Sequence, residues 1–211
     1  MPRRDRPERR SQQDRSQATR TALIGTARRL FAERGYARVP AEEIVAAAGL
    51  TRGALYHHFA DKQDLFRATY EELEGEMSAE IAAAAAAAPD VPTGMAAGLG
   101  RFLSVCQRPE VARIALSDAP AVLGWQAWRE IEARHGLGLV TRMLQAAADE
   151  GLLVPAPVPV LARLVLSAVV EAALLIAHAE DHDAARAEAE QALLVLLSGI
   201  VRQPPSEPAR T

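Results

Sequence analysis

Apolar residues recur at helical spacing along most of the chain, and no segment alternates apolar and polar residues as a strand does. Leu23, Ala27 and Leu30 stand at i, i+4 and i+7, which is one face of a helix. This helix begins near Ser16 and ends at Gly35, a suitable C-terminal cap. Further helices are predicted over residues 41–48, 51–59, 61–88, 94–106, 109–118, 124–150, 158–179 and 184–202. The pattern therefore predicts an all-α fold of about nine helices.

Capping residues and helix breakers define several of these boundaries. Pro40 suits the first turn of the second helix, and Thr51 and Asp61 suit the N-caps of the third and fourth. The run Ala82–Ala88 has the highest intrinsic helix propensity available, so it either completes the fourth helix or forms a flexible low-complexity linker. Pro89 ends the helix that precedes it, and we expect the residues beyond it to form a second helical region.

Charge is distributed unevenly along the chain. Residues 1–62 hold 13 basic and 7 acidic side chains, a balance of +6, whereas the rest holds 11 and 20, a balance of −9. This asymmetry indicates that the basic end binds a polyanion. For the first 13 or so residues, a charged disordered tail is an equally good interpretation. The charges inside the predicted helices still favour a nucleic-acid partner.

Composition excludes several classes of protein. Cys106 is the only cysteine, which rules out an intrachain disulfide and fits a reducing compartment. The most apolar stretch, 158–179, contains Arg163 and Glu171, and the N-terminal arginines precede no apolar run, so we expect neither a membrane span nor a signal peptide. The predicted location is the cytoplasm. No phosphate loop, nucleophile elbow or metal-ligand spacing occurs, so we expect no catalytic residue, no cofactor and no metal.

Two short helices, Ala41–Ala48 and Thr51–Phe59, are joined by a tight turn that contains Gly49, and they form a helix-turn-helix pattern. The second helix of such a motif lies in the major groove of DNA. Leu55 and Phe59 are spaced to pack inward. The other positions offer hydroxyls, cations, ring nitrogens and small side chains that suit base edges and phosphates: Thr51, Tyr56, Arg52, Lys62, His57, His58, Gly53 and Ala54.

Residues 20–66 closely resemble the DNA-binding domain of TetR-type transcriptional regulators. The resemblance is carried by Gly49–Lys62 (GLTRGALYHHFADK), by the Leu65–Phe66 pair after it, and by Phe31–Tyr36 (FAERGY), which is similar to the end of the family's first helix. It implies DNA contacts from Thr51, Arg52, Gly53, Tyr56, His57 and Lys62, with Lys62 on a phosphate. Val39 and Pro40 depart from the family pattern, which usually has Thr or Ser there, so a hydroxyl contact is not expected at that point.

The resemblance further implies a C-terminal region that forms a homodimer and binds a small effector. The helices over 158–179 and 184–202 are apolar over much of their circumference, which fits a four-helix interface between two copies or a helix buried within one chain. The predicted interface residues are Ala168, Ala172, Leu175, Leu194 and Leu197.

Six residues are candidates for lining the effector pocket: Phe102, Trp125, Trp128, Met143, Glu171 and His178. Glu171 and His178 are seven residues apart on an otherwise apolar helix, so they share a face and need partners from the protein, water or a ligand. Trp128 fits the surface or the dimer interface equally well.

The sequence therefore predicts four regions: a disordered basic arm over 1–15, a helix-turn-helix domain over 16–62, an effector-binding and dimerisation domain over 63–203, and a frayed tail over 204–211. The leading hypothesis is a homodimeric repressor that binds a palindromic double-stranded DNA operator and is released by an unidentified small molecule. The alternative is a dimeric DNA-binding protein that responds to no effector.

Overall fold

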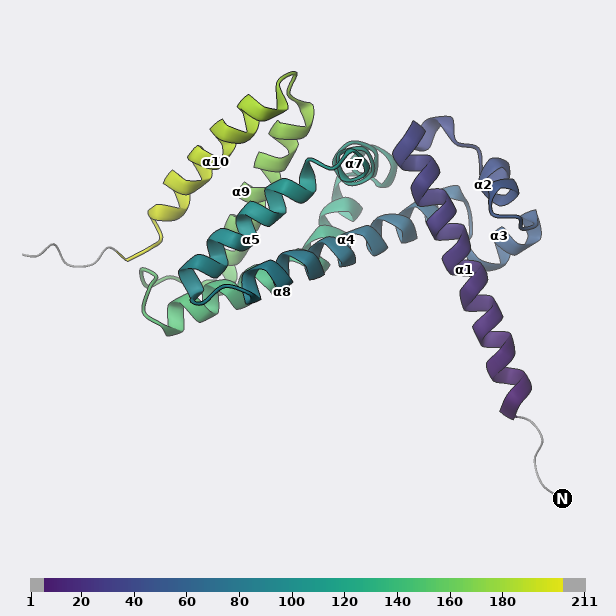
Figure 1. Cartoon of the computed structure of the whole chain (residues 1–211), viewed down its shortest axis with the longest axis horizontal. Coiled ribbons are helices and arrows are strands. Elements are labelled where there is room, and N and C mark those ends of the chain that lie inside the picture. The colour runs from purple at the N-terminus through teal and green to yellow at the C-terminus, as the bar shows by residue number, and fades with distance from the viewer. Residues whose placement is uncertain (1–5, 203–211) are drawn as a thin grey trace, which may run out of the picture. The chain divides into compact units, whose positions relative to one another are not determined.

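The computed structural model describes residues 6–202, and the regular elements among them are helical (Figure 1). The first part comprises α1 (Arg6–Arg34), the 3-10 turn η1 (Tyr36–Arg38), α2 (Ala41–Ala47), α3 (Arg52–His58) and α4 (Lys62–Ala86). The rest comprises α5 (Val91–Cys106), α6 (Pro109–Val111), the π-helical stretch η2 (Ala112–Asp118), α7 (Ala119–Leu123), α8 (Trp125–Asp149), α9 (Val158–His178) and α10 (His182–Ser198). Counting 109–123 as one irregular helix gives nine, so the predicted all-α fold is confirmed.

The N-terminal arm differs from its prediction. Helix α1 begins at Arg6, so residues 6–15 are helical where the sequence predicted disorder. Arginine, glutamine and glutamate are good helix formers, and extending an existing helix costs far less than nucleating a new one. The packed half of α1 therefore propagates into the polar half. Residues 1–5 and the predicted frayed tail over 204–211 lie outside the described residues.

The chain divides into two compact units. The N-terminal unit ends at Leu73 and also includes Pro109–Trp128, whereas the C-terminal unit consists of Glu74–Arg108 and the chain from Arg129 onward. The sequence predicted a domain boundary between residues 62 and 63. In the structure, the start of α4 and the segment 109–128 also belong to the unit that contains the helix-turn-helix. They share the core of that unit and are hydrogen-bonded to it.

The core of the N-terminal unit is centred on aromatic contacts between α1, η1 and α4. The Phe31 and Phe66 rings meet edge to face with centroids 5.3 Å apart, and the Tyr36 ring lies 5.1 Å from Phe66. Helices α1 to α4 bury further side chains in the same unit: Leu23, Ile24, Ile44, Leu55, Leu65 and Tyr70.

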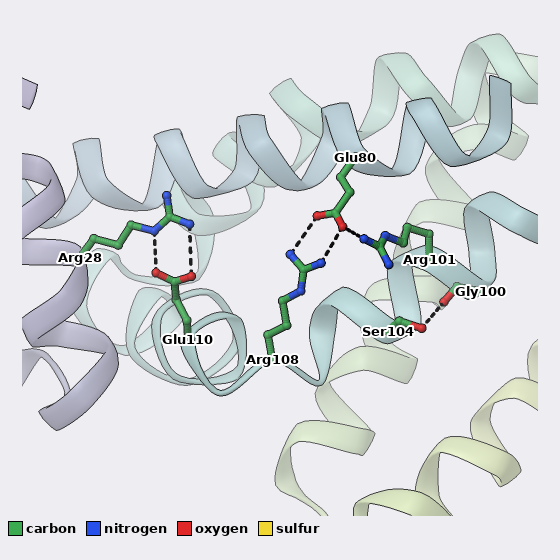
Figure 2. Close-up of polar contacts among 7 residues, drawn as sticks. All are labelled: Arg28, Glu80, Gly100, Arg101, Ser104, Arg108 and Glu110. Atoms are coloured by element: carbon green, nitrogen blue, oxygen red, sulfur yellow. Dashed lines mark hydrogen bonds and ion pairs between the residues drawn. The ribbon is translucent and has the colours of Figure 1, made fainter. Parts of the chain in front are cut away.

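Segment 109–123 is fastened to this unit by three polar contacts. The Arg28 guanidinium donates two hydrogen bonds, of 2.5 and 3.2 Å, to the carboxylate of Glu110 (Figure 2). The backbone N–H of Tyr36 donates to Asp118 at 2.8 Å. The Gln63 side chain donates to the carbonyl of Val122 at 2.7 Å. The segment is therefore bonded to α1, to η1 and to the first turn of α4.

In the C-terminal unit, small residues allow α5 to lie close to α4. A Cβ on Gly94 would stand 2.8 Å from the backbone oxygen of Ala85, so only glycine fits there. Ala85 belongs to the alanine run, which is helical to Ala86 and therefore completes α4, as one of the two predictions had it. Glu80 of α4 pairs with Arg101 and Arg108, which join α5 and the residues after it to α4 (Figure 2).

Helices α9 and α10 pack together and against α5. Ala172 and Ile176 of α9, Leu103 of α5, and Ala189 and Leu193 of α10 form one buried cluster. By length and composition, α9 is the one described helix that is apolar enough to cross a membrane, a criterion that core helices of soluble proteins also meet.

Candidate nucleic-acid interface

The turn between α2 and α3 has the geometry that the sequence predicts. Gly49 adopts a φ of +66°, in the left-handed region that favours glycine, and it directs the chain out of α2. Thr51 follows in an extended conformation, and its hydroxyl oxygen accepts a 3.2 Å hydrogen bond from the backbone N–H of Ala54. The predicted N-cap at Thr51 is confirmed, and it fixes where α3 begins.

Helix α3 is held by two apolar side chains and presents its other faces to solvent. Leu55 is fully buried and Phe59, which ends the helix, is 3% exposed. The exposed residues include every α3 position that the resemblance implies for DNA contact, namely Thr51, Arg52, Gly53, Tyr56 and His57. A rigid helix with an open polar face is what insertion into a major groove requires.

Arg52 is ordered by two weak contacts. Its guanidinium lies 3.7 Å from a carboxylate oxygen of Glu42 in α2 and 5.4 Å from the centre of the Tyr56 ring. The Arg52 and Glu42 side chains are 70% and 63% exposed, and such pairs contribute about 0–1 kcal/mol. Arg52 is therefore positioned in the free protein and is released from Glu42 at little cost. The sequence places Glu42 in the first turn of the second helix and does not predict its contact with Arg52.

Lys62 lies in a different environment from the one implied for it. Its ammonium donates hydrogen bonds to the carbonyls of Tyr36, at 3.0 Å, and Val39, at 3.1 Å. It also stands 3.8 Å from the centre of the Tyr36 ring, and its partial burial lowers its pKa. These contacts tie α4 to the connection between α1 and α2. A phosphate contact by Lys62 stays a prediction, and the structure adds a positioning role.

The six predicted pocket residues lie in different environments and belong to both units. Trp128 is buried in the N-terminal unit, where its indole N–H donates to the carbonyl of Ala115 at 3.0 Å, so the surface and interface alternatives are wrong for it. Trp125, beside it, is 61% exposed. In the C-terminal unit, Phe102 packs against the cluster of α5, α9 and α10, and Met143 of α8 contacts Gly98 of α5.

The structure corrects the placement of Glu171 and His178. Both side chains are exposed on α9, and the His178 ring is hydrogen-bonded to the carbonyl of Leu174 at 2.8 Å. They do share a face, as predicted, but it is the outer one, where Leu164 and Leu175 are also exposed. Periodicity identifies residues that lie together and does not say which face points inward.

The predicted interface residues differ in how far their side chains are exposed. Leu175 and Leu194 are 59% and 55% exposed, whereas Ala168 and Leu197 are half-buried. Ala172 is 5% exposed and belongs to the α5–α9–α10 cluster, so its side chain does not face a partner. Four further apolar residues are exposed on α9 and α10: Val160, Leu164, Val195 and Leu196.

Sequence reasoning also missed a buried carboxylate in α8. Glu132 is 5% exposed, with one oxygen 2.7 Å from the Arg129 guanidinium. Burial raises its pKa to about 7, and the Arg129 charge opposes part of that shift. The signal in the sequence was a Glu beside Ile131 on the apolar side of a helix.

Two family models match the chain: "Tetracyclin repressor-like, C-terminal domain" over residues 92–200, and "Bacterial regulatory proteins, tetR family" over residues 23–69. The structure is similar to a crystal structure of a TetR-family transcriptional regulator from Pectobacterium atrosepticum, with a TM-score of 0.82 and 36% identity, covering 90% of this chain and 98% of that one. The chain belongs to the TetR family. Members of this family are DNA-binding transcriptional regulators, which confirms the interpretation of the helix-turn-helix.

Curated TetR-family relatives match over shorter stretches. An HTH-type transcriptional repressor of Mycobacterium tuberculosis is 34% identical over 113 residues, which are 54% of this chain and 59% of that protein. The TetC protein of transposon Tn10 from Escherichia coli is 28% identical over 145 residues, 67% of this chain and 72% of that protein. The matched stretch thus spans less than two thirds of the first of these TetR relatives.

Proposed function

We propose that the protein is a homodimeric transcriptional repressor that binds a palindromic double-stranded DNA operator through α3 and is released from it by a small-molecule effector. The observation that carries the proposal is the exposed face of α3, capped by Thr51 and anchored by Leu55 and Phe59. The relative from Mycobacterium tuberculosis carries the name of a repressor, which supports the sign of regulation.

Arg52, Gly53 and Tyr56 are the proposed base-reading residues. A guanidinium near the start of the helix suits the paired acceptors of a guanine edge, and a glycine lets the helix approach the bases closely. The hydroxyl of Thr51 accepts the capping bond and keeps its own proton for a phosphate or base acceptor. His57 is exposed next to this face and serves as a further donor.

A second copy of the chain is the proposed partner for the outer surface of α9 and α10. Leu164 and Leu175 on α9 and Leu194, Val195 and Leu196 on α10 are each more than half exposed. An apolar surface of this kind favours association because burying it removes hydrocarbon from water. A two-fold dimer presents two α3 helices, which fits a palindromic operator.

Segment 109–123 is the proposed route by which an effector changes DNA affinity. It belongs to the N-terminal unit and is bonded there through Glu110, Asp118 and the carbonyl of Val122, whereas the helices that precede and follow it in sequence, α5 and most of α8, belong to the C-terminal unit. A ligand held by α5 and α8, near Phe102 and Met143, would shift the ends of this segment and with them the position of α1 and α4.

One observation favours the alternative, an effector-independent dimer. Two of the six residues predicted to line a pocket, Glu171 and His178, are exposed. The two functions differ in a measurable way, because only a protein with an effector site loses operator affinity when a small molecule binds. For either function we place the protein in the cytoplasm, where operator DNA is found.

Selection of operators from a random pool of duplexes, followed by a compound screen, tests the proposal. The full chain is expected to enrich a palindromic sequence. A subset of compounds is expected to raise the melting temperature and to release the selected duplex. Enrichment of no sequence would contradict the DNA-binding proposal. Enrichment without any releasing compound would favour the effector-independent alternative.

A further inference from the structure

A cleft of about 650 Å³ lies between the N-terminal half of α1 and α3, within the N-terminal unit. Figure 1 shows α1 continuing past α3 towards its N-terminal end. The α1 wall of the cleft consists of Gln12, Gln13, Arg15, Ser16 and Thr19. The α3 wall consists of Thr51, Ala54, His57 and His58. Helical residues before Ser16 are thus built into a surface beside the DNA-reading helix.

The lining of the cleft is suited to an anion. It contains one guanidinium, two carboxamides, three hydroxyls and two imidazoles, and no carboxylate is among the lining residues. Thr19 donates its hydroxyl proton to the carbonyl of Arg15, so the donors of α1 that face the cleft are the two glutamines, Arg15 and Ser16. These side-chain types are the ones that contact phosphate and sugar oxygens in DNA complexes.

The electrostatic environment of the α3 wall is positive. The Arg20 guanidinium lies 5.4 Å from the centre of the Phe59 ring, at the end of α3. The pKa of His58 is lowered, first by burial and then by repulsion from His57 and Arg20. A negative group in the cleft would relieve this repulsion.

The exposed residues of α3 fall on two flanks. Arg52 and Tyr56 contact each other on the flank nearer α2, whereas Ala54, His57 and His58 face α1 across the cleft. A helix with its side chains is about 10–12 Å across. The major groove is about 12 Å wide. Inserted there, α3 fills the groove, and each flank lies beside a sugar–phosphate strand.

We propose that the cleft between α1 and α3 holds the sugar–phosphate backbone of one DNA strand, with Arg15 on a phosphate and Gln12 and Ser16 as neutral donors along the strand. This inference rests on the proposed function and extends it, because the N-terminal half of α1 becomes the outer wall of the DNA site. Its contacts are independent of sequence, so they increase affinity for every duplex and fix the register of α3.

Arg15→Gln tests the charge contact, with Arg29→Gln as the matched control. Arg29 is on the same helix, is 55% exposed, pairs with Glu33 at 3.4 Å and does not line the cleft. Arg15→Gln is expected to weaken binding to the selected operator and to a scrambled duplex by the same factor. It should also reduce the slope of log K against log salt by about 0.9 for each half-site, or about 1.8 for the dimer. Arg29→Gln should leave both quantities unchanged.

A methylphosphonate scan locates the contact on the DNA. Each operator phosphate is neutralised in turn, and the duplexes are titrated with the wild type and with Arg15→Gln. In each half-site there should be one phosphate, or two adjacent ones, whose neutralisation weakens wild-type binding. The same neutralisation should add little to the loss that Arg15→Gln already causes. Ser16→Trp fills the cleft without changing its charge. It should weaken binding to the operator and to the scrambled duplex at least tenfold, while the melting temperature of the protein is retained.

The outcomes separate this inference from the proposed function. If the wild type distinguishes operator from scrambled duplex but Arg15→Gln behaves as Arg29→Gln does, with additive losses at every phosphate, the backbone cleft is wrong and the repressor proposal stands. If the wild type does not distinguish the two duplexes, the proposed function itself fails.

Discussion

The ammonium of Lys62 donates a 3.0 Å hydrogen bond to the carbonyl of Tyr36 and lies 3.8 Å from the centre of the same residue's ring. Lys62 is the only lysine in a sequence with 24 basic residues. A compact ammonium with three donors reaches two carbonyls and a ring face together, whereas the guanidinium of arginine is larger and donates only in its own plane. We therefore interpret Lys62 as the residue that fixes α4 to the connection between α1 and α2.

Lys62→Met should destabilise the protein by about 2 kcal/mol, because it removes the donor of the Val39 carbonyl and leaves the Tyr36 carbonyl with the backbone N–H of Val39 alone. Lys62→Arg should recover only part of this loss. The free energy of unfolding in denaturant measures both. If Lys62→Met is as stable as the wild type and instead lowers the salt dependence of DNA binding, Lys62 is a phosphate ligand and the positioning role is wrong.

Substitutions at Thr51 should separate stability from DNA binding. Thr51→Ala removes the cap on Ala54 and is expected to cost about 1 kcal/mol of stability. Thr51→Asp keeps a capping oxygen, so stability should be retained, but it places a negative charge on the exposed face of α3 and should weaken binding to every duplex. Denaturation and DNA titration of the same two variants check this. Equal DNA affinity of Thr51→Asp and the wild type would contradict the placement of this face against DNA.

The pair formed by Arg28 and Glu110 should couple α1 to segment 109–123 energetically. The two side chains are 21% and 32% exposed and form two hydrogen bonds. A double-mutant cycle with Arg28→Ala and Glu110→Ala should therefore give a coupling free energy of about 1 kcal/mol. The neighbouring pair Arg29 and Glu33 is an internal control, because both side chains are more than half exposed and their nearest atoms are 3.4 Å apart. Its coupling should be about 0.3 kcal/mol. Equal coupling in the two cycles would contradict a specific link.

Glu132→Gln should stabilise the protein at alkaline pH. The folded-state pKa of Glu132 is raised from 4.5 to about 7, so the folded protein binds the proton more tightly than the unfolded chain does. Stability contributed by this group is therefore lost as pH rises from about 4.5 to 7 and stays low above that. Ionisation of Glu132 therefore lowers the free energy of unfolding by about 3 kcal/mol above pH 7. The difference in unfolding free energy between Glu132→Gln and wild type should be largest near pH 8 and vanish near pH 4. A difference independent of pH would show that packing, not charge, distinguishes them.

Signals within a few residues of each position predicted the helix-turn-helix well. Gly49, Thr51, Leu55 and Phe59 have the predicted turn, cap and inward roles because each depends on contacts within a few residues. Other features depend on partners distant in sequence. Trp128 is buried against the carbonyl of Ala115, which no spacing rule indicates.

Faces and boundaries were predicted less well, for physical reasons. Ala172 and Glu171 are adjacent on α9, yet one is buried against α5 and α10 and the other is exposed, which depends on where the neighbouring helices lie. The extension of α1 to Arg6 has no apolar periodicity that would predict it, and Gln12, Gln13 and Arg15 line a cleft rather than a core.

The most direct test of the account is the ratio of Kd values for the selected operator and a scrambled duplex, measured by fluorescence anisotropy for the wild type, Arg52→Ala and Arg29→Ala. We expect the wild type and Arg29→Ala to prefer the operator about 1,000-fold or more. Arg52→Ala should lose about 1–3 kcal/mol of that preference in each half-site while its binding to the scrambled duplex changes far less. An Arg52→Ala ratio equal to that of the wild type would contradict the claim that α3 reads the DNA sequence.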